Sequence, residues 1–106
     1  MPEPIFRPVL DDAALTNDSA EVVEVGERKV ALARCGGKVH ALDNSCPHTG
    51  GPLGRGTVKD GKITCPLHHW TFDLDTGKCV EGVAWEKVKV YPCRVQDGKI
   101  EIELKL

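Results

Sequence analysis

Apolar and polar residues alternate in short runs along the chain, and glycine, proline and aspartate separate these runs. The runs are rich in Val and Ile, as expected of strands that bury one face. The clearest are 22–25, 29–33, 39–42, 88–91 and 100–104. No segment of ten or more residues has the apolar spacing of three and four that an amphipathic helix requires. We therefore expect an all-β domain of about eight to ten short strands.

Three dipeptides between these runs predict tight turns: Gly36-Gly37, Asp60-Gly61 and Asp97-Gly98. Glycine and aspartate accept positive φ at little steric cost, so each dipeptide can close a β-hairpin. The polar stretch 11–21 is interpreted as a surface loop after a first strand. No internal repeat or low-complexity tract interrupts the pattern.

Length and composition narrow the function classes. A chain of 106 residues is enough for one domain with one core. The formal net charge is −2 and the basic residues are scattered, so we expect no nucleic-acid binding. The first residues carry no charged segment leading into an apolar run, and no stretch approaches the roughly 20 apolar residues of a membrane span. We expect a cytoplasmic protein without a membrane partner.

Two pairs of potential metal ligands lie in the middle of the sequence. Cys46-Pro47-His48 is followed, after sixteen residues, by Cys65-Pro66-Leu67-His68. A binuclear iron-sulfur cluster needs two protein ligands on each iron, and two thiolates with two imidazoles meet that need. The hairpin predicted at Asp60-Gly61 would bring the pairs together. Two Cys and two His also suit a tetrahedral zinc ion, which is the structural alternative.

The residues around these pairs resemble the cluster-binding loops of Rieske proteins. The resemblance is carried by Cys46-Pro-His-Thr-Gly-Gly-Pro-Leu53 and Cys65-Pro-Leu-His-His-Trp-Thr-Phe-Asp-Leu74, and it continues in Asp75–Lys78 and Tyr91–Val95. It implies one Rieske-like domain over residues 1–106, an antiparallel β-sandwich or barrel. The cluster-binding subdomain would consist of two loops at one end, at about 45–56 and 64–73.

The resemblance also implies the cofactor and its ligands. Cys46 and Cys65 would bind one iron of a [2Fe-2S] cluster, and His48 and His68 would bind the other. The iron bound by histidine would be the one reduced. Two neutral imidazoles in place of two thiolate anions leave the cluster less negative, which makes it easier to reduce than an all-cysteine cluster.

Other residues near the motif are given no role as ligands. His69 stands where the family usually has glycine, which constrains the loop, and we interpret it as an exposed residue of the loop tip. Three further cysteines have no histidine at ligand spacing and are interpreted as small buried hydrophobic residues: Cys35, Cys79 and Cys93. Trp85 falls in a third segment that would cover the site.

The resemblance implies an electron carrier and leaves two kinds of partner open. The first function is a ferredoxin that passes single electrons from a flavin reductase to a terminal oxygenase. The second is the small subunit of an assimilatory nitrite reductase, bound to a large sirohaem-containing chain. The sequence has no convincing nucleophile and base arrangement and no phosphate-binding glycine motif, so we expect no enzymatic activity from this chain alone.

We predict a reduction potential near or below about −50 mV, within a Rieske range of about −150 to +300 mV. High-potential members from cytochrome bc complexes have a disulfide between the loops, and a serine and a tyrosine that donate hydrogen bonds to the cluster. This chain has Gly51 and Leu67 at the disulfide positions, and Trp70 and Phe72 in place of the two hydroxyl donors; both aromatics are expected to pack beneath the loop. A redox titration checks the prediction, and a midpoint above about +100 mV would contradict it.

Overall fold

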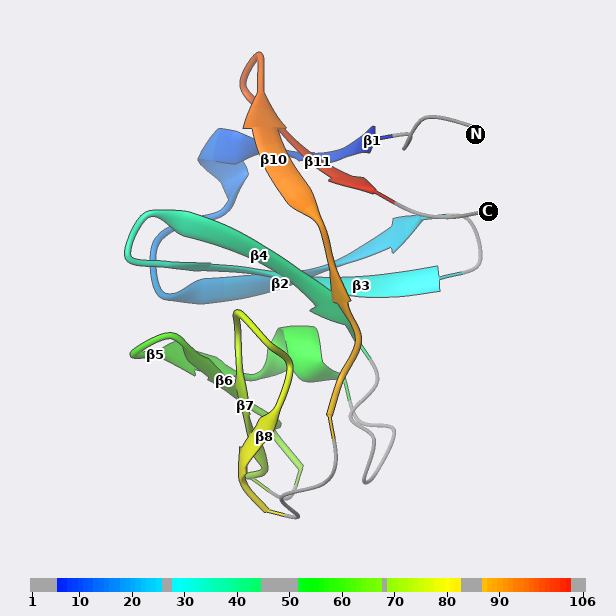
Figure 1. Cartoon of the computed structure of the whole chain (residues 1–106). Coiled ribbons are helices and arrows are strands. Elements are labelled where there is room, and N and C mark those ends of the chain that lie inside the picture. Colours follow the sequence, from blue (N-terminus) through cyan, green and yellow to red (C-terminus); the bar gives the residue numbers. More distant parts are fainter. Residues whose placement is uncertain (1–5, 26–27, 45–51, 68, 83–86, 104–106) are drawn as a thin grey trace.

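The computed structural model describes residues 6–25, 28–44, 52–67, 69–82 and 87–103 (Figure 1). Within them the chain forms eleven strands and two 3-10 helices of three residues each, η1 (Asp12–Ala14) and η2 (Leu53–Arg55). In these ranges no helix is long and apolar enough to span a bilayer. The all-β fold class expected from the sequence is confirmed, with slightly more strands than the expected eight to ten.

The strands form three antiparallel sheets that lie one above another in Figure 1. We call them the outer, middle and cluster sheets. The outer sheet has the order β1 (Phe6–Asp11), β11 (Lys99–Glu103), β10 (Cys93–Gln96). The middle sheet has the order β2 (Ser19–Val25), β3 (Arg28–Cys35), β4 (Lys38–Asp43), β9 (Val90–Tyr91). The cluster sheet has the order β5 (Thr57–Lys59), β6 (Lys62–Thr64), β7 (Thr71–Asp73), β8 (Cys79–Glu81).

The three predicted hairpin turns are confirmed by their backbone angles. Positive φ occurs at both central residues of each: 59° and 81° at Gly36-Gly37, 52° and 76° at Asp60-Gly61, and 53° and 76° at Asp97-Gly98. Two consecutive residues with positive φ are typical of type I′ turns, whose twist matches that of the flanking strands. These turns join β3 to β4, β5 to β6 and β10 to β11.

Two segments have other bounds in the structure than the sequence predicts. The polar stretch 11–21 is a shorter connection, because β1 reaches Asp11 and β2 begins at Ser19. Its apolar residue Leu15 is buried, and the Arg34 guanidinium donates to the Leu15 carbonyl oxygen at 2.8 Å. The strand expected at 88–91 is reduced to β9, because the Val88 N–H donates to the Gly77 carbonyl oxygen instead of to a neighbouring strand.

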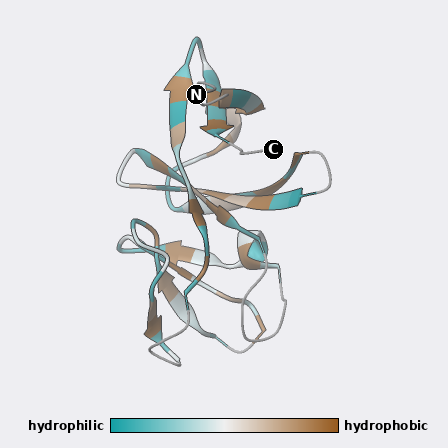
Figure 2. Cartoon of the chain, turned by 45° about the vertical axis from the view of Figure 1, so that its right-hand side comes forward, coloured by the Kyte–Doolittle hydropathy of each residue, from teal (hydrophilic) through white to brown (hydrophobic). Residues whose placement is uncertain are grey.

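The middle sheet separates two hydrophobic cores. Val30 and Leu32 of β3 belong to the core shared with the outer sheet, together with Ile100 and Ile102. The alternate β3 residue Ala31 belongs to the core shared with the cluster sheet, which also contains Ile63 and Phe72. Hydrophobic and hydrophilic bands accordingly alternate along many strands in Figure 2. Strand β3 therefore contributes side chains to both cores, one core on each of its faces.

The cluster sheet belongs to a single excursion from the middle sheet. The chain leaves at the end of β4 and returns in β9, and these two strands pair with each other in the register Ala41↔Tyr91. Beside that pair, the Asp43 N–H donates to the Lys89 carbonyl oxygen at 2.9 Å. The start and the end of the excursion are therefore side by side.

Three turns meet where the cluster sheet contacts the middle sheet. The Gly61 N–H, in the β5–β6 turn, donates to Cys35 Sγ at the end of β3 at 3.1 Å. The Gly61 carbonyl oxygen accepts from the Leu74 N–H, after β7, at 2.9 Å. We call this contact region the three-turn junction. It ties the cluster sheet to the β3–β4 hairpin through the hydrogen bond from the Gly61 backbone to the Cys35 side chain.

A buried histidine completes the three-turn junction. His40 of β4 is 8% exposed, and its Nδ1 lies 3.5 Å from Asp75 Oδ1. The Lys38 ammonium group lies 3.1 Å from the same carboxylate oxygen, and that contact holds the pKa of Asp75 below its usual value. Burial lowers the pKa of His40, and Lys38 adds to this, whereas Asp75, Asp73 and a backbone hydrogen bond with Leu74 act in the opposite direction.

We predict that His40 makes the fold less stable in mild acid. Because its pKa is lower in the folded than in the unfolded protein, the unfolded state binds more protons near and below pH 6.5. This contribution is fully present above that pH and is lost as the pH falls through the folded-state pKa. Urea unfolding between pH 7.5 and 5.5 should show a smaller loss of stability for His40→Gln than for the unchanged protein. Equal losses would contradict the prediction.

Candidate metal centre

One of the four predicted ligands lies within the described residues. Cys65 follows directly after β6 and is fully buried. Cys46, His48 and His68 lie outside the described residues, as does Trp85 of the third segment. The described ranges contain no group of three side chains able to hold a metal ion, and the proposed site takes three of its four ligands from outside them.

The second loop closes on itself after Cys65. The Cys65 N–H donates to the Trp70 carbonyl oxygen at 2.7 Å, and the His69 N–H donates back to the Cys65 carbonyl oxygen at 3.2 Å. These two bonds form a narrow turn whose tip includes Pro66 and Leu67, both exposed; the Leu67 side chain is 53% exposed. The loop therefore has a hydrogen-bonded base and a solvent-facing apolar tip.

The unusual His69 is exposed, as predicted, and its backbone explains the family preference for glycine. Its φ is 61°, in the left-handed region that glycine enters without steric cost. Histidine is among the residues found there more often than most, so the turn tolerates it. The constraint at this position therefore acts on the backbone.

Both aromatic residues in the second half of the second loop pack beneath its tip, as predicted. Phe72 is fully buried in the core between the middle and cluster sheets, and Trp70 is partly buried against the same core. The Trp70 ring lies so close to Gly82 that an added Cβ would be 2.7 Å from Trp70 Cδ2.

The base of the first loop is closed by Asn44, a residue that sequence reasoning missed. The Asn44 carbonyl oxygen accepts from the Leu53 N–H at 2.7 Å, and its Oδ1 accepts from the Gly54 N–H, also at 2.7 Å. These bonds join the two ends of the segment that carries Cys46 and His48. An asparagine before a loop is common, so the residue type alone did not indicate this role.

The remaining cysteines lie in the body of the fold. Cys79 is buried as expected. Cys35 and Cys93 are only partly buried, and each forms a sulfur hydrogen bond: Cys35 accepts from Gly61, and Cys93 donates to the Val39 carbonyl oxygen at 3.2 Å. Burial raises the pKa of the Cys93 thiol, which keeps it protonated at neutral pH.

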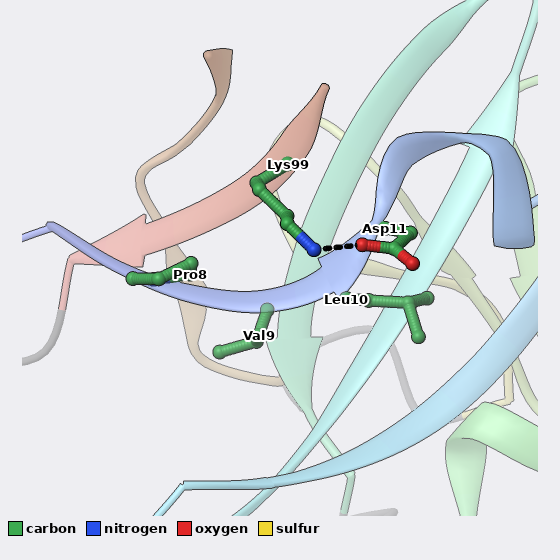
Figure 3. A pocket seen from close by; sticks show the side chains of 5 residues that line it. All are labelled: Pro8, Val9, Leu10, Asp11 and Lys99. Atoms are coloured by element: carbon green, nitrogen blue, oxygen red, sulfur yellow. Dashed lines mark hydrogen bonds and ion pairs between the residues drawn. The ribbon is translucent and has the colours of Figure 1, made fainter. Parts of the chain in front are cut away.

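Residues of the outer sheet line a surface groove (Figure 3). This sheet lies at the opposite end of the molecule from the cluster sheet (Figure 1). Its volume is about 380 Å³, and it is lined by Pro8, Val9, Leu10, Asp11 and Lys99. Figure 3 shows Lys99 and Asp11 paired with each other. With its charged groups paired and its other lining residues apolar, the groove offers no catalytic constellation.

Cys65, the described member of the predicted donor set, suits a ligand of an iron-sulfur cluster. Cys65 is a free thiol, not part of a disulfide, and stands at the base of a closed turn. That turn and the closed base of the first loop belong to the same excursion from the middle sheet. A thiolate is the side chain that binds the iron of such clusters, and burial shields it from water.

Comparisons with known proteins identify the family. Residues 6–92 match the model of the Rieske [2Fe-2S] domain. The anthranilate 1,2-dioxygenase ferredoxin subunit of Burkholderia cepacia is 34% identical over 89 residues, which are 84% of this chain and 82% of that protein.

Two solved structures have the same fold. The ferredoxin of carbazole 1,9a-dioxygenase from Nocardioides aromaticivorans superposes with a TM-score of 0.87 at 26% identity, over 94% of this chain and 98% of that one. A Mycobacterium tuberculosis protein named as an NADH-dependent nitrite reductase small subunit gives 0.88 at 27% identity, over 99% of each chain. The chain thus belongs to the Rieske [2Fe-2S] domain family, binds one [2Fe-2S] cluster and is an electron-transfer protein.

Proposed function

We propose that this protein is the ferredoxin component of an oxygenase system and carries single electrons from a flavin reductase to a terminal oxygenase. The observation that carries the proposal is the second loop, where a buried cysteine at a hydrogen-bonded base is followed by an exposed apolar tip. We further propose that Cys46 and Cys65 bind one iron, and that His48 and His68 bind the other.

The second loop suits outer-sphere electron transfer. Such transfer needs a cofactor near the surface and ligands that move little when the cluster gains an electron. The two hydrogen bonds across Cys65, His69 and Trp70 restrain the backbone on both sides of the proposed ligand His68. The exposed Leu67 beside it offers an apolar contact for a partner protein at the point where the electron would leave.

A second candidate function is the small subunit of an assimilatory nitrite reductase. It is favoured by the fold similarity to the Mycobacterium tuberculosis protein over 99% of both chains. In that role the protein would stay bound to a large sirohaem-containing chain. The same loops would then face a permanent partner instead of a transient one.

We also propose a cytoplasmic location. Three cysteines within the described ranges are free thiols: Cys35, Cys65 and Cys93. Free thiols are typical of a reducing compartment. A flavin reductase and an oxygenase that exchange electrons with this protein would be found in the same compartment.

The ligand set predicts which cysteines the cluster needs. Protein purified without oxygen should contain two irons per chain and, after reduction with dithionite, give an electron paramagnetic resonance signal of low average g. Cys46→Ser and Cys65→Ser should lose the cluster, whereas the controls Cys35→Ser and Cys93→Ser should keep it. A colourless protein that contains zinc would support the structural metal domain and contradict the electron carrier.

The carrier role predicts transient partners. In extracts of the cells that make it, the protein should elute from a sizing column as a small free protein. When reduced, it should reduce a purified terminal oxygenase in single-electron steps, and cluster-free Cys65→Ser should not. Elution together with a large sirohaem-containing chain would instead establish the nitrite reductase subunit.

A further inference from the structure

Asn44 connects the middle sheet to the first cluster loop. It is 7% exposed and follows directly after β4. Its N–H donates to the Lys29 carbonyl oxygen at 3.2 Å, which fixes the residue to β3. Its carbonyl oxygen and Oδ1 accept from the N–H groups of Leu53 and Gly54 at the far end of the loop. One residue therefore holds both ends of the loop.

The far end of the loop has no room to shift. Leu53 is fully buried in the core between the middle and cluster sheets. A Cβ added at Gly54 would lie 2.6 Å from Val22 Cγ2 and 3.0 Å from Asn44 Oδ1. The backbone at Gly54 is thus enclosed between β2 and the Asn44 side chain, which is long enough to reach the Gly54 N–H.

The same segment continues to the start of the second loop. Gly56, just after η2, packs against the backbone of Thr64, and an added Cβ would lie 2.0 Å from the Thr64 carbonyl oxygen. Thr64 is the last residue of β6 and directly precedes Cys65. A chain of close contacts therefore runs from Asn44 through Gly54 and Gly56 to the proposed ligand Cys65.

We infer that Asn44 is a positioning residue of the cluster, whose side-chain oxygen holds the end of the first loop, at Gly54, in its place next to the segment that leads to Cys65. The inference rests on the ligand assignment proposed above. The hydrogen bond to Gly54 is buried, so its loss leaves an N–H group without a partner and favours a shifted or open loop. A shifted loop changes the iron–ligand geometry, which the spectrum of the reduced cluster reports.

The test compares Asn44→Ala with a matched control, Asn17→Ala. Asn17 Oδ1 also accepts from a glycine N–H, that of Gly37, at 3.0 Å, but at the β3–β4 turn outside both cluster loops. Asn44→Ala should change the g values or broaden the signal of the reduced cluster, and should lose iron about tenfold faster than the unchanged protein. Asn17→Ala should keep the unchanged spectrum and rate of iron loss, whatever its effect on unfolding.

A second variant, Asn44→Asp, retains an oxygen acceptor for the Gly54 N–H and should restore the unchanged g values. If Asn44→Ala is purified without iron, the g values of Asn44→Asp still test the inference. An unchanged spectrum in Asn44→Ala, or an altered one in Asn44→Asp, would overturn the inference. The spectrum of the unchanged protein tests the ligand assignment separately, because a signal of high average g would refute the mixed ligand set whatever the variants show.

Discussion

The burial of β3 on both faces is the constraint on which this structure depends. Its alternate side chains fill two different cores, so the outer sheet and the cluster sheet are both held by one strand. Four consecutive residues, 30–33, are fully buried. Such a strand cannot slip by one residue without exchanging the contents of both cores, which fixes the register of the middle sheet. The starting points of the cluster loops follow from that register.

The sequence predicted the fold well wherever a local signal was enough. Strand alternation and the turn dipeptides reflect the preferences of a few neighbouring residues, and all three hairpins are confirmed by positive φ at both central residues. The shortened strand at β9 was missed because a distant partner decides it: Gly77, in another turn, accepts the Val88 N–H. A contact of this kind leaves no mark in the run of residues around Val88.

The cofactor was also predictable from the sequence, whereas the residues that brace the loops were not. Paired Cys and His at fixed spacing predict a metal centre because the ligand types are rare and their spacing is restrictive. Asn44 and His40 have no such mark. Each acts through a partner brought near by the fold, Gly54 for Asn44 and Asp75 for His40. Their roles appear only when the loops and turns are seen together.

The pairing of β4 with β9 has a consequence for how the family can diversify. Because the excursion leaves and returns at neighbouring strands, the outer and middle sheets form a scaffold into which the cluster-binding part is inserted as one module. Changes within the insertion can retune the cofactor while the scaffold keeps its pairing. Conversely, changes in the outer sheet, at the other end of the molecule, would leave the cluster-binding part unchanged.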